Sequence, residues 1–195
     1  AIAEPDEKRR LDAAEKLFVK PERCFESAQD MFAKGRMGDA AIIASMDKDH
    51  YAQAMRALEL GYDLLLEKPI SPDPLECMLI EERARKTGRR VVVCHVLRYS
   101  PFFRQIKKII DSGELGRVVT IQHNENIGNF HMAHSFVRGN WSQAAVSSPI
   151  IMQKSCHDMD LLVWLVSSKA AKLSSFGDLS YFKEDNAPPG SAGRC

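Results

Sequence analysis

The most constraining feature of the sequence is a run of three leucines at 64–66, which ends abruptly at Glu67, Lys68 and Pro69. A short, continuous aliphatic run is typical of a strand that is covered on both faces, as in a parallel sheet. Gly61 ends the helical pattern before the run, and Pro69 biases Lys68 away from a helical conformation. We therefore predict that Lys68 lies at the carboxyl end of a strand, which is the edge where α/β sheets bind ligands.

Strands and helices alternate on either side of this run. Apolar, β-branched segments predict further buried strands at 40–44 and 90–96, while apolar residues recur at helical spacing over 47–60 and 72–87. This alternation predicts right-handed crossovers and a doubly wound parallel sheet. The fold class is therefore α/β, and residues 1–98 are predicted to form an incomplete Rossmann-like parallel sheet with helices on both faces.

The pattern changes after residue 98, so we predict a second, partial domain over 99–195. It begins with an amphipathic helix, followed by a half-exposed strand at 116–125 and a pocket-lining loop at 126–149. A largely apolar helix is predicted at 150–166. A short strand is predicted at 172–176.

Composition excludes several classes of protein. The 27 basic and 26 acidic residues of the 195-residue chain give a net charge of +1, and no basic stripe favours nucleic acid or a membrane surface. The five cysteines are scattered and form no Cys-x-x-Cys, which favours a reducing, cytoplasmic location. No apolar run approaches the roughly 18 to 20 residues of a transmembrane helix.

The chemistry is expected to involve Lys68 and His157. A histidine, whose ordinary pKa is near ~6.5, can take the proton of a substrate hydroxyl group, while an ammonium group stabilises the developing alkoxide. His157 lies in a second dense polar cluster, at 154–160. A pocket that contains both groups could oxidise an alcohol.

Four motifs together resemble a known family. They are Ala-Ile-Ile-Ala-Ser-x-x-x-x-His at 41–50, Glu-Lys-Pro at 67–69, Arg-Tyr-x-Pro at 98–101 and His-Asp-x-Asp at 157–160. In this order they resemble the Gfo/Idh/MocA oxidoreductases, and the match runs from Ile2 to about Phe176. The resemblance implies an NAD(P)-binding Rossmann domain and a C-terminal α/β domain. The largely antiparallel sheet of that second domain carries the substrate site and often an oligomer interface.

The resemblance also implies roles for individual residues. Lys68 matches the active-site lysine of the family and His157 matches its catalytic histidine. Glu67, Ser45 and His50 match positions near the nicotinamide and its ribose. The implied reaction transfers hydride between a nicotinamide cofactor and a sugar, polyol or related hydroxy compound, and the implied assembly is a homo-oligomer.

Glu4 matches the acid at the end of the family's second strand. A carboxylate there can accept hydrogen bonds from an adenosine ribose but would repel a 2′-phosphate, which favours NAD as cofactor. Arg9 and Arg10 lie close in sequence and leave NADP open.

Two departures from the family pattern affect these expectations. The Gly-rich phosphate loop that precedes the second strand is absent, so we expect the chain to be a truncated copy that binds cofactor poorly. Many members also carry an aspartate four residues before the catalytic histidine, where this chain has Gln153. Lys154, three residues before His157, lies within reach of the same helix face, so we infer a site made of Lys68, Lys154 and His157.

Structural interpretations compete with several of these assignments. Lys68 could be a solvated strand-end lysine, His157 a histidine at a helix start, and Ser45 and His50 helix caps. Arg98, at the predicted domain junction, is expected to form a structural ion pair or hydrogen bond. A zinc site that combines His131 and His134 with Cys156 and His157 is disfavoured by its loose spacing, so no metal site is predicted.

Two other functions remain open. An NAD-dependent glycosidase could use the same fold and a tightly held cofactor to hydrolyse a glycosidic bond through transient oxidation. A non-catalytic protein could instead sense a dinucleotide and touch a protein partner, in which case Lys68 would not be needed for function.

Overall fold

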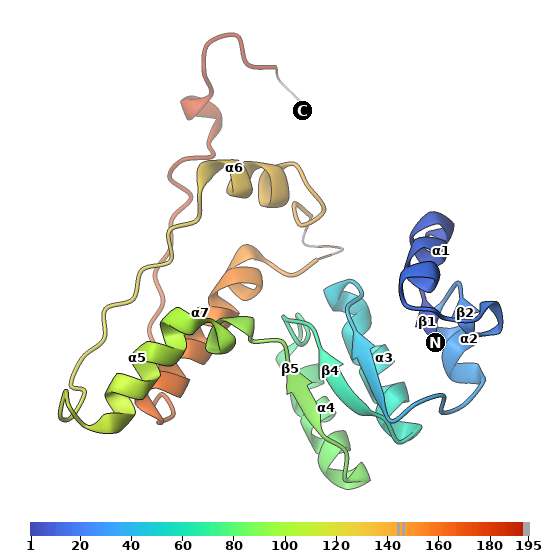
Figure 1. Ribbon diagram of the computed structural model, residues 1–195. Coiled ribbons are helices and arrows are strands. Elements are labelled where there is room, and N and C mark those ends of the chain that lie inside the picture. Colours follow the sequence, from blue (N-terminus) through green and yellow to red (C-terminus); the bar gives the residue numbers. More distant parts are fainter. Residues whose placement is uncertain (144, 146, 193–195) are drawn as a thin grey trace.

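The computed structural model describes residues 1–143, 145 and 147–192, and its elements follow the predicted alternation (Figure 1). The first part of the chain contains β1 (Ile2–Ala3), α1 (Glu7–Lys16), β2 (Cys24–Phe25), α2 (Ala28–Ala33), β3 (Ala40–Ile43), α3 (His50–Glu59), β4 (Asp63–Leu66), α4 (Pro74–Thr87) and β5 (Val91–Val93). The second part contains α5 (Pro101–Ser112), α6 (Asn129–His131) and α7 (Ile150–Val166). Single turns of 3-10 helix lie at 21–23, 47–49, 96–99 and 184–186.

The strands form two parallel sheets. β1 pairs with β2, and β3, β4 and β5 pair in that order, so that Ile43, Leu66 and Val93 stand side by side at the carboxyl edge of the larger sheet. The Rossmann-like parallel architecture predicted from the alternation is therefore confirmed. The sheet hydrogen bonds do not join β1 to β3, so the predicted single sheet is divided in two within the described residues.

The prediction of helices on both faces is wrong for the larger sheet. Its strands follow one another in a single direction, and right-handed crossovers then place the connecting helices α3 and α4 on one and the same face. On the opposite face, one residue from each strand forms an apolar row. These residues, Ile42, Leu65 and Val92, are directly paired and remain 74%, 38% and 48% exposed.

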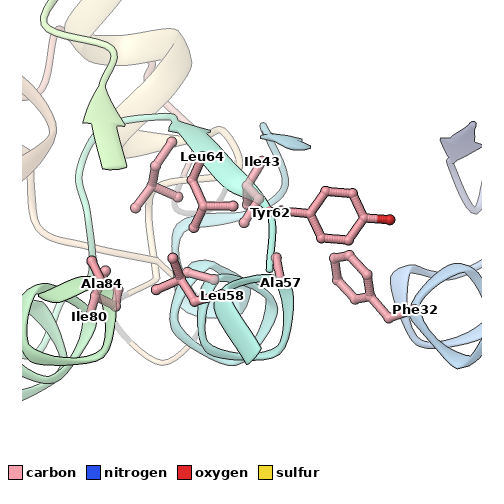
Figure 2. Close-up of a cluster of buried hydrophobic side chains, with 10 residues drawn as sticks. Phe32, Ile43, Ala57, Leu58, Tyr62, Leu64, Ile80 and Ala84 are labelled. Atoms are coloured by element: carbon pink, nitrogen blue, oxygen red, sulfur yellow. The ribbon is translucent and has the colours of Figure 1, made fainter. Parts of the chain in front are cut away.

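The hydrophobic core lies between this sheet and its two helices. Figure 2 shows Ala57 and Leu58 of α3 and Ile80 and Ala84 of α4 packed beneath the strand residues. From the strands, Ile43, Leu64 and Leu66 are each at most 3% exposed. At one end of the core, Phe32 of α2 packs against Tyr62 with 6.1 Å between ring centroids.

Burial on one face predicts very different costs for two neighbouring leucines. Leu66 is fully buried, so Leu66→Ala should lower the free energy of unfolding by about 2 to 5 kcal/mol, through lost burial and the cavity left behind. Leu65→Ala removes the same atoms on the exposed face and should cost well under half as much. Urea unfolding of both variants measures the difference. Equal costs would mean that a second layer covers the Leu65 face in solution.

The second part of the chain is built on two helices. α5 contacts α7, and the intervening chain runs out along an extended segment to α6, which continues as a π-helical turn over 132–137 (Figure 1). The loop predicted at 126–149 is thus partly helical. The helix predicted at 150–166 is confirmed at both ends, although Val163 and Val166 near its end are each 43% exposed.

No strand follows β5 in the described ranges, so the strands predicted at 116–125 and 172–176 do not form there. A strand needs a neighbour to accept and donate its backbone hydrogen bonds, and neither segment meets one. The predicted antiparallel sheet is accordingly not present in this part of the chain. Among the same residues, no helix is long and apolar enough to cross a membrane.

Candidate active site

Lys68 lies at the carboxyl edge of the larger sheet, as predicted, and reaches across to α7. It is the second residue after the end of β4, and its peptide bond to Pro69 is cis. The side-chain ammonium donates a hydrogen bond to the backbone carbonyl of Gln153, with Nζ 3.3 Å from the oxygen. An ammonium has three donors, so the described residues leave most of its hydrogen-bonding capacity for a ligand.

Gln153 is held in place from the other side. Its amide Nε2 donates to Oδ2 of Asp47 at 2.8 Å, and the same oxygen accepts a bond from the backbone N–H of Ser148 at 2.7 Å. Asp47 and Gln153 are only 4% and 5% exposed. The start of α7 is therefore anchored to the segment after β3, which fixes the carbonyl that Lys68 contacts.

His157 lies one helical turn beyond Gln153 on α7 and is half-buried. Among the described residues, neither ring nitrogen has a hydrogen-bond partner. Nδ1 is buried, whereas Nε2 is not among the buried unpaired atoms. Burial lowers the pKa of His157, and the positive charge of Lys68 and the neighbouring His95 lower it further. The predicted lysine and histidine thus influence one another, and the neutral imidazole that a base requires is favoured.

A second histidine, which the sequence analysis did not single out, packs against His157. The rings of His95 and His157 meet edge to face with 5.8 Å between centroids. Nε2 of His95 lies 3.8 Å from Oδ1 of Asp160. Arg98 donates two hydrogen bonds of 2.6 Å to the same carboxylate. Burial lowers the pKa of His95 as well, while Asp160 opposes the shift.

The ion pair of Arg98 confirms the prediction made for it. The hydrogen bonds to Asp160 raise the pKa of the Arg98 guanidinium, whose plane also lies over the Trp164 ring at 5.6 Å from the centroid. Because Arg98 follows β5 and Asp160 belongs to α7, the pair ties the helix that carries His157 to the sheet.

The contact of Lys154 that the structure describes is with an aromatic ring. Its ammonium lies 6.0 Å from the centroid of the Phe136 ring, a cation–π arrangement, and no hydrogen bond joins it to Lys68 or His157 among the described residues. The described contacts therefore give no support to the inferred site of Lys68, Lys154 and His157. Cys156 is also beside Lys68, but burial raises the pKa of its thiol, which keeps it protonated and unreactive.

The predicted cofactor residues lie along the carboxyl edges of the strands. Ser45 follows β3, is exposed, and its hydroxyl donates to Oε1 of Gln53 at 3.0 Å. Glu67 accepts the backbone N–H of Lys68 at 3.1 Å. His50 is 1% exposed, with Nδ1 2.9 Å from the carbonyl of Pro69 and Nε2 3.2 Å from that of Ser45. His50 is therefore buried between two strand ends, and because a neutral imidazole carries one N–H, it donates to one of these two carbonyl groups at a time.

Glu4, which the sequence predicts to bind the adenosine ribose, lies just past β1. Its Oε1 accepts the backbone N–H of Asp6 at 3.0 Å, and no described residue donates a hydrogen bond to Oε2. The guanidinium of Arg10 is occupied by the Glu4 backbone carbonyl at 2.6 Å and by Glu26 at 3.6 Å. This arrangement suits a ribose hydroxyl better than a 2′-phosphate. The sequence contains no Gly-x-Gly-x-x-Gly, so a pyrophosphate cradle of that type is not among its residues.

The residues considered for zinc are not brought together. The His131 ring packs on Phe136 and the His134 ring on Phe130. Elsewhere in the described chain, His123, Glu125 and Asp158 have ligand atoms within 4.8 Å of one another. His123 and Asp158 already satisfy each other through a 2.7 Å bond, and Glu125 is exposed, which is an ordinary polar contact.

The lowered pKa values of His95 and His157 predict a loss of stability in acid. Each folded pKa lies below the value of about 6.5 expected for an unfolded chain. The unfolded state therefore binds protons first as pH falls, and the free energy of unfolding drops from pH 6.5 downward. The lowering of these pKa values is reduced by nearby acids, Asp158 and Asp160 for His157 and Asp160 for His95. It is enhanced by Lys68 at His157 and by Arg98 at His95.

Urea unfolding across this pH range should show a shallower fall of the free energy of unfolding for His157→Phe than for the wild type. The exposed-site control His131→Phe should leave the slope unchanged, and an unchanged slope in His157→Phe would refute the assignment.

Comparison with known proteins gives matches over nearly the whole chain. Residues 1–95 match the family model described as "Oxidoreductase family, NAD-binding Rossmann fold", and residues 103–188 match the "GFO/IDH/MocA C-terminal domain". The YteT protein of Bacillus subtilis, whose name places it only among oxidoreductases, is 31% identical over 161 residues. An inositol 2-dehydrogenase of Corynebacterium glutamicum is 28% identical over 177 residues.

These alignments cover much of this chain but only part of each relative. They include 83% and 89% of the chain, but 37% of YteT and 48% of the inositol 2-dehydrogenase. The chain therefore spans about half the length, or less, of these curated relatives.

Solved structures share the fold. The chain superposes on a Lactobacillus casei scyllo-inositol dehydrogenase with bound NAD(H) and scyllo-inositol at a TM-score of 0.72, with 23% identity. This covers 85% of the chain and 47% of that protein. An Azotobacter vinelandii inositol dehydrogenase homolog, complexed with NADH and myo-inositol, gives 0.71 at 22% identity, over 86% and 45% of the two chains.

Proposed function

Because the chain belongs to the Gfo/Idh/MocA oxidoreductase family, we propose that it is part of an NAD-dependent dehydrogenase that oxidises a secondary alcohol of a polyol or sugar. The observation that carries the proposal is the approach of Lys68 to α7. Its Nζ binds a carbonyl one helical turn from His157, and its charge lowers the pKa of that histidine. A cation and a neutral imidazole beside one another at a sheet's carboxyl edge are suited to deprotonate a hydroxyl group.

Lys68 is the residue that binds and polarises the reacting oxygen. One of its donors is used by the Gln153 carbonyl, which aims the ammonium while leaving the other donors for the substrate. As the hydroxyl group loses its proton, the positive charge of Lys68 stabilises the negative charge on oxygen. This stabilisation grows toward the transition state, which is the condition for lowering the barrier.

His157 is the base that receives the proton. Nε2 is the ring nitrogen that is not buried, so it is the atom that a substrate hydroxyl can approach. Repulsion by Lys68 disfavours the imidazolium in the resting protein, and this repulsion weakens as the alkoxide forms beside the lysine. In the reverse reaction the same nitrogen returns the proton.

NAD is the cofactor that the described residues suit, and when bound it supplies the hydride acceptor. Glu4 would bind the adenosine ribose, while Ser45 and Glu67 would lie toward the nicotinamide ribose. His50 would hold the strand ends rather than touch the cofactor, since it is 1% exposed and lies between the Pro69 and Ser45 carbonyl groups.

A cyclic polyol is the substrate class that we put first. The curated inositol 2-dehydrogenases and the solved complexes with inositols share the family or the fold with this chain. The open Nε2 of His157 and the spare donors of Lys68 would both face hydroxyl groups, whichever ring presents them.

The test is an assay with a panel of inositols and aldoses in the presence of NAD or NADP. A dehydrogenase produces reduced nicotinamide in step with oxidised product. A glycosidase of this fold would instead release sugar from a glycoside with no net change in cofactor, and a dinucleotide sensor would bind NADH without turnover. Reduction of NADP in preference to NAD would contradict the role given to Glu4.

Other expectations stay predictions alongside this function. The four cysteines that the structure describes are free thiols, in keeping with the predicted reducing, cytoplasmic location, while Cys195 lies outside the described residues. We also propose that 116–125 becomes a strand of an antiparallel sheet when a partner strand is supplied. The domain boundary near residue 98 and the homo-oligomer follow from the sequence analysis and the family.

A further inference from the structure

His157 lacks the partner that a catalytic histidine ordinarily has. When one ring nitrogen acts as a base, the other carries the proton, and a hydrogen-bond acceptor normally fixes it there. Here Nδ1 of His157 is buried, and no group in the described part of the chain accepts its proton. Gln153 occupies the position where an aspartate is common in the family, but its amide is turned away to Asp47.

The other polar neighbours of His157 are already engaged. Asp158 pairs with His123 at 2.7 Å, and Asp160 is held by both guanidinium bonds of Arg98. Lys68 and Arg98 only donate. The remaining candidate among the described residues is His95, whose own Nδ1 is also buried and unpaired.

The two unpaired nitrogens belong to rings that touch. His95 and His157 meet edge to face at 5.8 Å between centroids, and the preferred torsion of a histidine ring about its Cβ–Cγ bond is broad. The two Nδ1 atoms are unpaired in the structure, and rotation of the rings about these bonds is the movement that pairing them requires. His95 is also oriented on its far side, because its Nε2 lies 3.8 Å from the Asp160 carboxylate, where an N–H is favoured.

We propose that His95 is a positioning residue that accepts a hydrogen bond from Nδ1–H of His157 and thereby keeps Nε2 of His157 free to act as the base. The line of groups runs from His157 through His95 to Asp160, with Arg98 fixing the far end. It performs the task that a carboxylate performs for histidine in hydrolytic triads, but the acceptor is a neutral imidazole. The inference rests on the proposed function, since it specifies how His157 is prepared for its role.

The tautomer of His157 tests this directly in the chain itself, without cofactor or substrate. Long-range ¹H–¹⁵N NMR spectra at about pH 8, where the lowered pKa values leave both rings neutral, should show His157 mainly protonated on Nδ1. His95→Phe keeps a ring of similar shape but removes the acceptor. The ratio of Nδ1–H to Nε2–H tautomers of His157 should then fall by about threefold to tenfold, which corresponds to one net hydrogen bond.

Two further variants separate positioning from packing. His95→Asn retains a carbonyl oxygen near the place of Nδ1 and should restore the wild-type tautomer ratio, whereas His131→Phe, on an exposed histidine, should not change it. The proposal is overturned if His157 in the wild type is mainly protonated on Nε2. It is also overturned if His95→Phe leaves the ratio unchanged or if His95→Asn behaves like His95→Phe. Failure of the dehydrogenase assay with a normal tautomer result would instead contradict the proposed function alone.

Discussion

Turnover of a polyol substrate is expected to fall by about a hundredfold to a thousandfold when Lys68 is replaced by methionine, because the alkoxide loses its principal charged donor. Methionine preserves much of the side-chain length and its apolar packing, so the fold should remain intact. The loss should appear mainly in kcat, since the charge on oxygen develops in the transition state. Steady-state formation of reduced nicotinamide provides the measurement, with circular dichroism to confirm folding.

Lys86→Met is the matched control for that variant. Lys86 lies in the last turn of α4 and pairs with Glu82, with 69% of its side chain exposed. Its loss removes one ammonium group without touching the carboxyl edge, and turnover should stay within about twofold of the wild type. If Lys68→Met retained wild-type turnover, the ammonium would have no part in catalysis and the sensor function would gain support.

The second large effect is expected for His157→Asn. Asparagine cannot take up a proton, so the rate should fall by the factor of about a hundred to ten thousand that general base catalysis contributes. The pH profile should change as well. In the wild type, kcat falls on the acid side as the imidazole is protonated, and this limb should vanish in the variant.

His134→Asn serves as the control for the pH profile. His134 is exposed and packs against Phe130, so it should retain both the rate and the acid limb. An acid limb that persisted in His157→Asn would show that another group is the base. His95 would then be the first residue to examine, because it shares the same buried surroundings.

The parallel part of the fold could be predicted because its signals are local. The aliphatic runs at 40–44 and 64–66 are each followed by a helical pattern. Gly61 and Gly88 lie just after α3 and α4, with backbone φ angles of 86° and 65°. Those signals also placed Lys68 correctly. Which face the helices cover depends instead on the spatial order of the strands, and no local signal in the sequence encodes that order.

The missed histidine has a specific cause. The β-branched pattern predicts a strand over 90–96, whereas β5 ends at Val93. In the predicted strand, His95 is a residue within the strand. With the correct boundary it follows β5 and lies at the same carboxyl edge as Lys68. The rule that ligands bind at the carboxyl ends of parallel strands would have identified His95. The error was a predicted strand that ended three residues too late.

The contacts of side chains on α7 are a second feature that the sequence does not determine. Lys154 and His157 are three residues apart, which permits contact on a helix but does not require it. The ring of Phe136, from a segment that the sequence predicts as a loop, lies close enough to attract the Lys154 ammonium. Likewise, Gln153 is drawn to Asp47, more than a hundred positions earlier in the chain. Such long-range polar partners leave no periodic signature.

The central claim is that Lys68 and His157 share one site, and the pKa of His157 measures it most directly. NMR titration of the imidazole should show a pKa below the ordinary 6.5 in the wild type. Because Lys68 contributes to that lowering, the pKa should rise in Lys68→Met and stay unchanged in Lys86→Met. An identical pKa for His157 in the wild type and in Lys68→Met would mean that the two groups do not meet, and the proposed mechanism would fail.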